Sequence, residues 1–106
     1  MDFTGTYYVV SSPHFDDEYL HLTGTPYVAL RQHENGRIEG EYWIGAQSGT
    51  LNGHAHSNFI DFSFGGSDEM EEAFGEGEAT LDGDRLTFEL WNYHGDEYVF
   101  ECERRR

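Results

Sequence analysis

Apolar and polar residues alternate along most of this chain, in short segments that end at turns. The clearest segment runs from Val28 to Ile44 and is interrupted once, at Glu34-Asn35-Gly36. Because successive side chains of a strand point to opposite faces, this alternation predicts a half-buried antiparallel sheet. We expect strands near residues 3–10, 27–33, 37–44, 48–56, 58–64, 73–81, 85–91 and 97–103.

The length of the turn at Asn35-Gly36 decides which residues of the second hairpin share a face. A two-residue turn would place Val28 and Leu30 with the glutamates of the next strand. A three-residue loop with Gly36 in the left-handed conformation avoids this. We predict the longer loop, because a slip of one position would bury two glutamates at a cost of several kcal/mol. Val28 and Leu30 then lie beside Ile38, Gly40, Tyr42 and Ile44.

The inward face assigned in this way alternates bulky aromatic residues with glycines. Small residues set against large ones fill the taper of a small closed barrel, and closure removes exposed strand edges. We therefore predict one all-β domain, residues 1–106, folded as an eight-stranded antiparallel up-and-down β-barrel. Its inward residues include Phe3, Gly5, Tyr7, Val9, Leu51, Gly53, Ala55, Ile60, Phe62, Phe64, Gly75, Gly77, Ala79, Leu81, Leu86, Phe88, Leu90, Tyr98, Phe100 and Cys102.

Two stretches lack regular alternation. Residues 11–25 are predicted to form a long crossover, or to contain an extra short strand from Tyr19 to Thr23. Residues 65–72, Gly-Gly-Ser-Asp-Glu-Met-Glu-Glu, are expected to form an exposed acidic loop, with or without one helical turn.

Two short motifs resemble those of the calycin-type barrels, and of the avidin and streptavidin family most. They are Gly5-Thr6-Tyr7 and the segment from Gly36 to Tyr42, which looks like that family's Gly-x-Leu-x-Gly-x-Tyr. The resemblance implies an eight-stranded barrel with a ligand cavity at one mouth. Tyr42 matches the tyrosine that in the family helps hold the ureido oxygen of biotin. The tryptophans that wall the family's biotin site have no clear counterparts, because Trp43 and Trp91 face outward in the predicted register.

The charge of the chain is strongly negative, with 21 acidic residues, 6 arginines, no lysine and a formal net charge of −15. Such a surface repels phosphate backbones and anionic lipids, so we expect no nucleic-acid and no membrane partner. The acidity serves either solubility, including life in high salt, or the attraction of a cation or basic partner; solubility is the favoured interpretation.

The compartment is predicted to be cytoplasmic. The single Cys102 cannot form an intramolecular disulfide, which is typical of a reducing cytosol. We see neither an apolar run of about 18 residues nor a signal-peptide pattern at the start.

Five inward aromatic residues form the candidate ligand site: Tyr7, Tyr42, Phe62, Phe88 and Tyr98. They either line an apolar pocket in which the hydroxyls orient a small molecule, or form a solid core with tyrosine tips at the rim. The leading hypothesis is a non-enzymatic binding module for a small, mostly apolar ligand. The alternatives are a barrel-type cyclase or isomerase, and a purely structural or self-associating protein with a filled core.

The pattern assigns no catalytic residue and no cofactor, since no inward carboxylate pair stands out and Cys102 is expected to be buried and inert. His54 and His56 share the outer face of a strand, but a stable metal site needs further ligands. The acidic residues at 68–72 lack the alternating ligands and central glycine of a calcium loop. We therefore predict solvated side chains rather than metal ligands in both places.

Four aromatic residues fall on the outward, mostly charged face: Trp43, Phe59, Phe74 and Trp91. Phe74 and Trp91 are predicted to lie on neighbouring strands. Clustered exposed aromatic residues mark interfaces. The pattern therefore predicts a homo-oligomer that assembles through part of the barrel wall.

Overall fold

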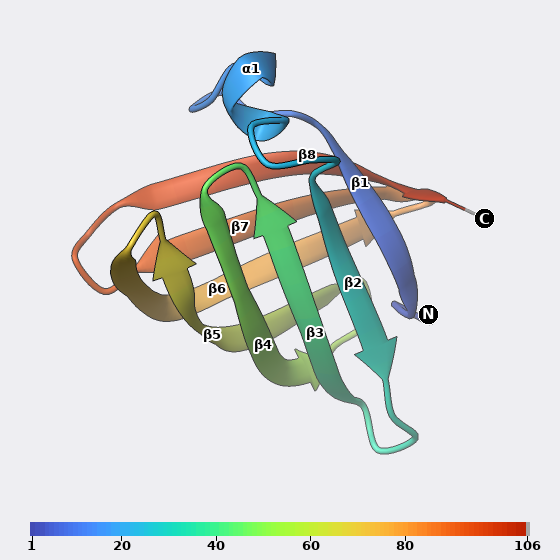
Figure 1. Cartoon of the computed structure of the whole chain (residues 1–106). Coiled ribbons are helices and arrows are strands. Elements are labelled where there is room, and N and C mark those ends of the chain that lie inside the picture. The colour runs from blue at the N-terminus through green and yellow to red at the C-terminus, as the bar shows by residue number, and fades with distance from the viewer. Residues whose placement is uncertain (106) are drawn as a thin grey trace.

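The fold is a closed β-barrel of eight strands, taken here from a computed structural model that describes residues 1–105 (Figure 1). Each strand pairs antiparallel with its neighbours in sequence, and β8 pairs with β1. This confirms the predicted eight-stranded up-and-down barrel. The elements are β1 (Gly5–Ser11), α1 (Asp17–Leu20), β2 (Tyr27–Gln32), β3 (Arg37–Ile44), β4 (Gln47–Ala55), β5 (Phe59–Asp68), β6 (Glu71–Asp82), β7 (Arg85–Asn92) and β8 (Glu97–Arg105).

The β2–β3 hairpin has the predicted three-residue loop, residues 34–36. Gly36 has a φ of +83°, a left-handed conformation that glycine adopts without steric cost. Val28 lies opposite Tyr42, so the apolar residues of both strands face inward and the glutamates of β3 face outward. The predicted register is confirmed here and in the later hairpins.

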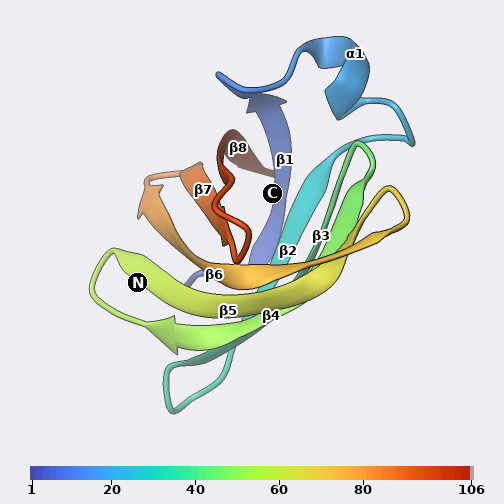
Figure 2. The same ribbon diagram turned by 90° about the vertical axis from the view of Figure 1, so that its left-hand side faces the viewer.

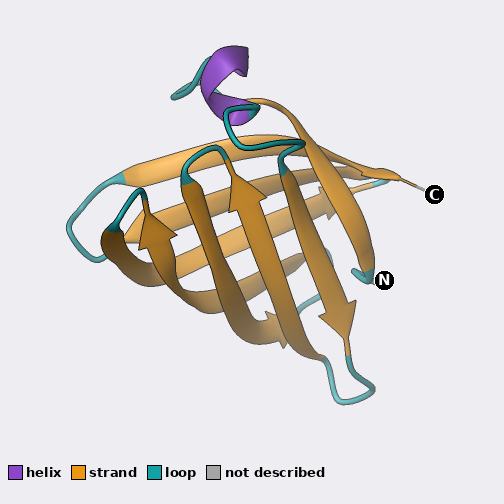
Figure 3. Cartoon of the chain, in the orientation of Figure 1, coloured by secondary structure: helices purple, strands orange, loops and turns teal. Residues whose placement is uncertain are grey.

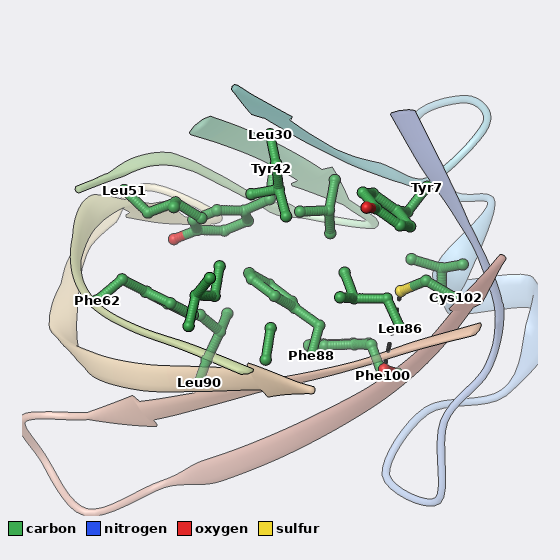
Figure 4. Close-up of a cluster of buried hydrophobic side chains, with 14 of the residues drawn as sticks. Tyr7, Leu30, Tyr42, Leu51, Phe62, Leu86, Phe88, Leu90, Phe100 and Cys102 are labelled. Carbon is green, nitrogen blue, oxygen red and sulfur yellow. Dashed lines mark hydrogen bonds between the residues drawn. The ribbon is translucent and has the colours of Figure 1, made fainter. Parts of the chain in front are cut away.

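The barrel interior is filled by apolar side chains from every strand (Figure 4). The rings of Phe62 and Phe88 stack at its centre, with centroids 5.3 Å apart. Full burial of each large side chain contributes roughly 1.5–3 kcal/mol. The buried apolar residues are Phe3, Tyr7, Val9, Leu20, Val28, Leu30, Ile38, Tyr42, Ile44, Leu51, Ile60, Phe62, Phe64, Ala79, Leu81, Leu86, Phe88, Leu90, Phe100 and Cys102.

The two ends of the barrel differ. We call one end the upper mouth: it carries α1 and the β3–β4, β5–β6 and β7–β8 turns, at the upper left of Figure 1. The lower end carries both chain termini and the other turns. Figure 2 shows α1 beyond the ends of the strands, and Figure 3 shows that the rest of the ordered structure is strand. Within residues 1–105, no helix is long and apolar enough to span a membrane.

A plug formed by Phe3, Tyr7 and Arg104 closes the lower end. The Tyr7 hydroxyl donates to the Phe3 carbonyl (2.7 Å) and accepts from Arg104 Nη1 (3.2 Å). The guanidinium carbon also lies 5.5 Å from the centroid of the Tyr7 ring. The first strand was predicted from residue 3, but β1 begins at Gly5. The Phe3 N–H donates to the side chain of Gln32 rather than to a backbone carbonyl of a neighbouring strand.

Residues 11–25 contain one helical turn, so the alternative of an extra strand from Tyr19 to Thr23 is wrong. Asp16 Oδ1 accepts a hydrogen bond from the Tyr19 N–H (3.0 Å) and caps α1. Asp17 in the first turn also favours the helix through its dipole. Leu20, at the end of the turn, is 1% exposed and packs onto the barrel core.

The predicted exposed loop at 65–72 is also wrong. Strands β5 and β6 continue through it, and only Glu69 and Met70 form the turn, with Glu69 at a φ of +60°. The two glycines at 65 and 66 suggested a break, but β4 and β6 supply hydrogen-bonding partners on both sides of them. This pairing overrides the low strand propensity of the glycines.

Candidate functional site

The structure separates the five aromatic residues of the predicted pocket. Tyr7 belongs to the lower plug, where both of its hydrogen bonds are structural. Phe62 and Phe88 stack in the middle of the core. Tyr42 lies above them, 5.9 Å from Phe88 between ring centroids, and Tyr98 is half-buried at the upper mouth. Only Tyr42 and Tyr98 therefore lie where a ligand entering from the upper mouth would meet them.

The Tyr42 hydroxyl forms no hydrogen bond within the described part of the chain. The residue is 2% exposed, and no group among residues 1–105 forms a hydrogen bond with its Oη. Burial, with a contribution from the charge of Asp68, raises the pKa of Tyr42 to about 12, so the phenol is neutral at physiological pH. The oxygen itself keeps some contact with solvent, although the rest of the side chain is buried.

This hydroxyl points along a row of small residues. Figure 4 shows the oxygen directed away from Tyr7, toward the side of the barrel that carries Leu51 and Phe62. The register places Tyr42 opposite Gly49, then Gly66 and Ala73 on the next two strands. These three small residues face inward yet are only half-buried. Solvent therefore reaches the inner wall at this level.

The next row toward the lower end closes the interior. Leu51 and Phe64 lie there and are 1% and 5% exposed. The Phe64 ring meets the Tyr42 ring edge-on, with centroids 6.1 Å apart. The interior is therefore closed by side chains below the level of Tyr42.

Asp68 is the inward-facing carboxylate that the sequence analysis missed. It lies on the same face of β5 as Ile60 and Phe64, and pairs with the buried Gln47 of β4. Burial raises the pKa of Asp68, and the nearby charges of Glu69, Glu71 and Asp96 raise it further. Continuing the alternation of β5 through the supposed loop would have placed Asp68 on the inner face.

Three tyrosines lie close enough to Asp68 for its charge to affect them. Burial is the main cause of the raised pKa values of Tyr19, Tyr42 and Tyr98, and the charge of Asp68 adds to the rise in each case. Gln47 Nε2 donates to the Tyr19 hydroxyl (3.1 Å). We call Tyr19, Tyr42, Gln47, Asp68 and Tyr98 the mouth site.

The segment that contains α1 covers one side of the upper mouth. The ring of Phe15 stacks on Tyr19 (centroids 4.3 Å apart) and meets Tyr98 edge-on (4.9 Å). Thr23 ties the same segment to the β3–β4 turn by donating to the Gly45 carbonyl (2.6 Å). Tyr19 extends this cover to β4, where its hydroxyl accepts a hydrogen bond from Gln47.

The outer wall carries a second hollow, of about 580 Å³. Its floor is formed at Gly53, Phe62 and Gly77, which lie side by side on β4, β5 and β6, and Trp91 lies at its edge. The backbone of this floor is paired in the strand ladders.

The outward aromatic residues fall into separate groups. Phe74 and Trp91 lie on the neighbouring strands β6 and β7, as predicted, and are each 38% exposed. Tyr93 stacks on Phe74 (centroids 5.1 Å apart) and extends this patch. Phe59 instead stacks on the ring of His56 (4.4 Å), and Trp43 donates to Thr23.

Within the described part of the chain, no group of three or more His, Cys, Asp or Glu side chains is arranged to hold a metal ion. His54 is exposed on β4, and His56 lies just beyond that strand and contacts Asp61 (3.2 Å). Cys102 is fully buried, as predicted, and burial raises the pKa of its thiol far above the usual range. Such a thiol is a poor nucleophile.

Comparison of the chain with protein-family models, with curated proteins and with solved structures finds no match. The resemblance of its two short motifs to the avidin family therefore stays a prediction. The arrangement of the mouth site is the basis for a functional proposal.

Proposed function

We propose that this barrel is a non-enzymatic binding module that holds a small, mostly apolar ligand in the mouth site. The observation that carries the proposal is the Tyr42 hydroxyl, which has no partner among the described residues, belongs to a side chain that is 2% exposed and faces half-buried positions of the inner wall. A ligand with one polar group would supply the missing hydrogen bond. The orientation of a mostly apolar ligand by a few polar groups is typical of small-molecule sites.

The packing limits the size of this ligand. The rings of Tyr42 and Tyr98 offer aromatic walls, whereas Gly49 and Gly66 leave little room beside them, because a Cβ at either glycine would collide with a neighbouring strand. The core filled by Phe62 and Phe88 stops the ligand from passing deeper. We therefore expect a ligand about the size of a single ring with a short side chain.

A second candidate function is proton transfer, of the kind used by barrel-type cyclases and isomerases. Asp68 is the observation that favours it, because a half-buried carboxylate with a raised pKa is suited to act as a general base. The neutral Tyr42 phenol would be the hydrogen-bond donor. In such an enzyme Asp68→Asn would abolish turnover while the substrate still bound, whereas in a binding module it changes only affinity.

Fluorescence titration with the neutral single-ring dye 4-(dimethylamino)benzonitrile tests the binding proposal. We expect saturable binding at one site, and at least about fivefold weaker binding to Tyr42→Phe, because a lost hydrogen bond contributes about 1 kcal/mol. The control is Tyr93→Phe, which removes an exposed hydroxyl from the outer wall and leaves binding unchanged. Absence of saturable binding, or equal binding by Tyr42→Phe, would overturn the proposal.

A further inference from the structure

We infer that the ligand of the mouth site is a small organic cation, an amine carried on an apolar body. This inference rests on the proposed binding function and names the chemical class of its ligand. It is carried by two independent observations, the distribution of charge between the two ends of the barrel and the unpaired hydroxyl of Tyr42.

Among residues 1–105, positive charge is confined to one end of the barrel, whereas carboxylates lie at both ends. All five arginines that the structure describes lie at the lower end, at the ends of β2 and β8 or the starts of β3 and β7: Arg31, Arg37, Arg85, Arg104 and Arg105. The upper mouth is surrounded by carboxylates from α1 and the two adjacent turns: Asp16, Asp17, Glu18, Asp68, Glu69, Glu71, Glu72, Asp96 and Glu97. Clefts lined by one sign of charge concentrate ligands of the opposite sign.

The ion pairs of the barrel follow the same division. Arg31 and Arg37 pair with Glu39, Arg85 with the acidic residues of β8, and Arg104 with Asp84. None of these pairs reaches the mouth site. Within the described chain, Asp68 has no cationic side chain beside it, and the charges acting on it come from other carboxylates.

An ammonium group matches the two polar groups that lie inside the mouth. It would donate one hydrogen bond to the Asp68 carboxylate and another to Tyr42 Oη, which has no donor of its own in the described structure. Charge-assisted hydrogen bonds of this kind are about twice as strong as neutral ones. The faces of Tyr42 and Tyr98 add cation–π attraction. A neutral ligand would satisfy only the hydroxyl, and an anion would be repelled.

Calorimetric titration with three matched probes tests this inference: 2-phenylethylamine, 2-phenylethanol and 3-phenylpropionate. At neutral pH and low salt, we expect the amine to bind about tenfold tighter than the alcohol, because it adds one charge-assisted hydrogen bond. We expect no binding of the carboxylate. Raising the salt concentration should reduce the preference for the amine only in part, because partly buried charges are screened less than exposed ones.

Two variants separate a direct contact from the general field of the acidic mouth. Asp68→Asn removes the inward carboxylate and should lower the affinity for the amine to that for the alcohol. Glu72→Gln removes an equal charge from the same hairpin, but Glu72 is exposed on the outer face opposite Ser67. The preference for the amine should persist in Glu72→Gln within about twofold, since surface charges contribute little.

The outcomes distinguish this inference from the function on which it rests. Equal affinity for the amine and the alcohol would overturn the cationic ligand and leave the binding module intact, and an equal loss in the two variants would overturn the direct contact with Asp68. Binding of 4-(dimethylamino)benzonitrile without binding of the amine would also overturn the cationic ligand and leave the binding module intact. Failure of all four compounds to bind would overturn both proposals.

Discussion

The hydroxyl of Tyr42 lies against Gly49, its partner on the neighbouring strand, so closely that a Cβ at Gly49 would come within 2.6 Å of Oη. The absence of a side chain at Gly49 is therefore what allows the Tyr42 ring to lie along the inner wall. The position of the hydroxyl, on which the proposed function depends, is set by a glycine on another strand.

Replacing Gly49 with alanine should destabilise the fold and displace the Tyr42 ring. The new Cβ would meet both Tyr42 Oη and the Gly65 carbonyl oxygen at 2.6 Å. Overpacking of this kind costs about 1–3 kcal/mol, measurable as a lower urea midpoint. Gly65→Ala is the matched control, because its Cβ meets nothing within 4 Å. Equal stability of Gly49→Ala and Gly65→Ala would show that the contact at Gly49 is not tight.

The two buried tyrosines should respond differently to loss of the hydroxyl. Tyr7→Phe removes a donor to Phe3 and an acceptor from Arg104, and should cost about 1–3 kcal/mol in free energy of unfolding. Tyr42→Phe removes a hydroxyl that has no partner among the described residues, so stability should stay the same or rise. Thermal denaturation of both variants checks this. If Tyr42→Phe lost as much free energy of unfolding as Tyr7→Phe, the Tyr42 hydroxyl would have a structural role instead of a binding role.

Asp68→Asn should stabilise the barrel at neutral pH. Because the folded state raises the pKa of Asp68, the folded protein holds this proton more tightly than the unfolded chain does. The Asp68 contribution to stability therefore falls as pH rises from the unfolded pKa, about 3.9, through the folded pKa, and the full penalty applies above it.

The gain from Asp68→Asn at pH 7 should be less than about 1 kcal/mol, since water screens a half-exposed carboxylate, and it should vanish below about pH 3.5. Chemical denaturation of both proteins at several pH values measures the difference. A variant that is less stable than the parent at pH 7 would mean that the ionised carboxylate makes a stabilising contact. A gain in stability with a loss of amine binding is the pattern expected of a functional residue.

Self-association through the outer wall stays a prediction, and the patch of Phe74, Trp91 and Tyr93 is the surface that would carry it. Two copies would each bring a net charge of −15, so association should strengthen as salt screens the repulsion. Sedimentation velocity at low salt and at about 1 M salt checks this. Phe74→Ser should abolish any dimer, with Trp43→Ser as the exposed aromatic control. A monomer at both salt concentrations would exclude this interface.

The alternation of apolar and polar residues was sufficient to predict the barrel and its register, because one face of each strand is buried and a slip would bury charge. The loop at Gly36 illustrates this, since only the three-residue form keeps Glu39 on the outside. The sequence pattern was less informative where long-range contacts decide the structure. Residues 65–68 extend β5 because β4 and β6 pair with them, which local propensity does not reveal.

The candidate site was predicted only in part. Tyr42 and Tyr98 were identified as inward aromatic residues, but alternation alone does not show which end of a barrel is closed. Tyr7 therefore appeared equivalent to them, until the packing of Phe3 and Arg104 showed that the lower end is plugged. The helix α1, four residues long, is too short to produce a helical periodicity, and its capping residue Asp16 was the one local signal for it.

The most direct test of the account is to locate a bound amine by two-dimensional amide NMR. Titration of the ¹⁵N-labelled protein with 2-phenylethylamine should shift the amide signals of Gly49, Gly66, Asp68 and Tyr98 along one binding curve. The signals of Asn52, Ser63 and Trp91 at the outer hollow should stay in place. Shifts confined to the outer wall, or a spectrum that the amine leaves unchanged, would contradict a ligand site at the upper mouth.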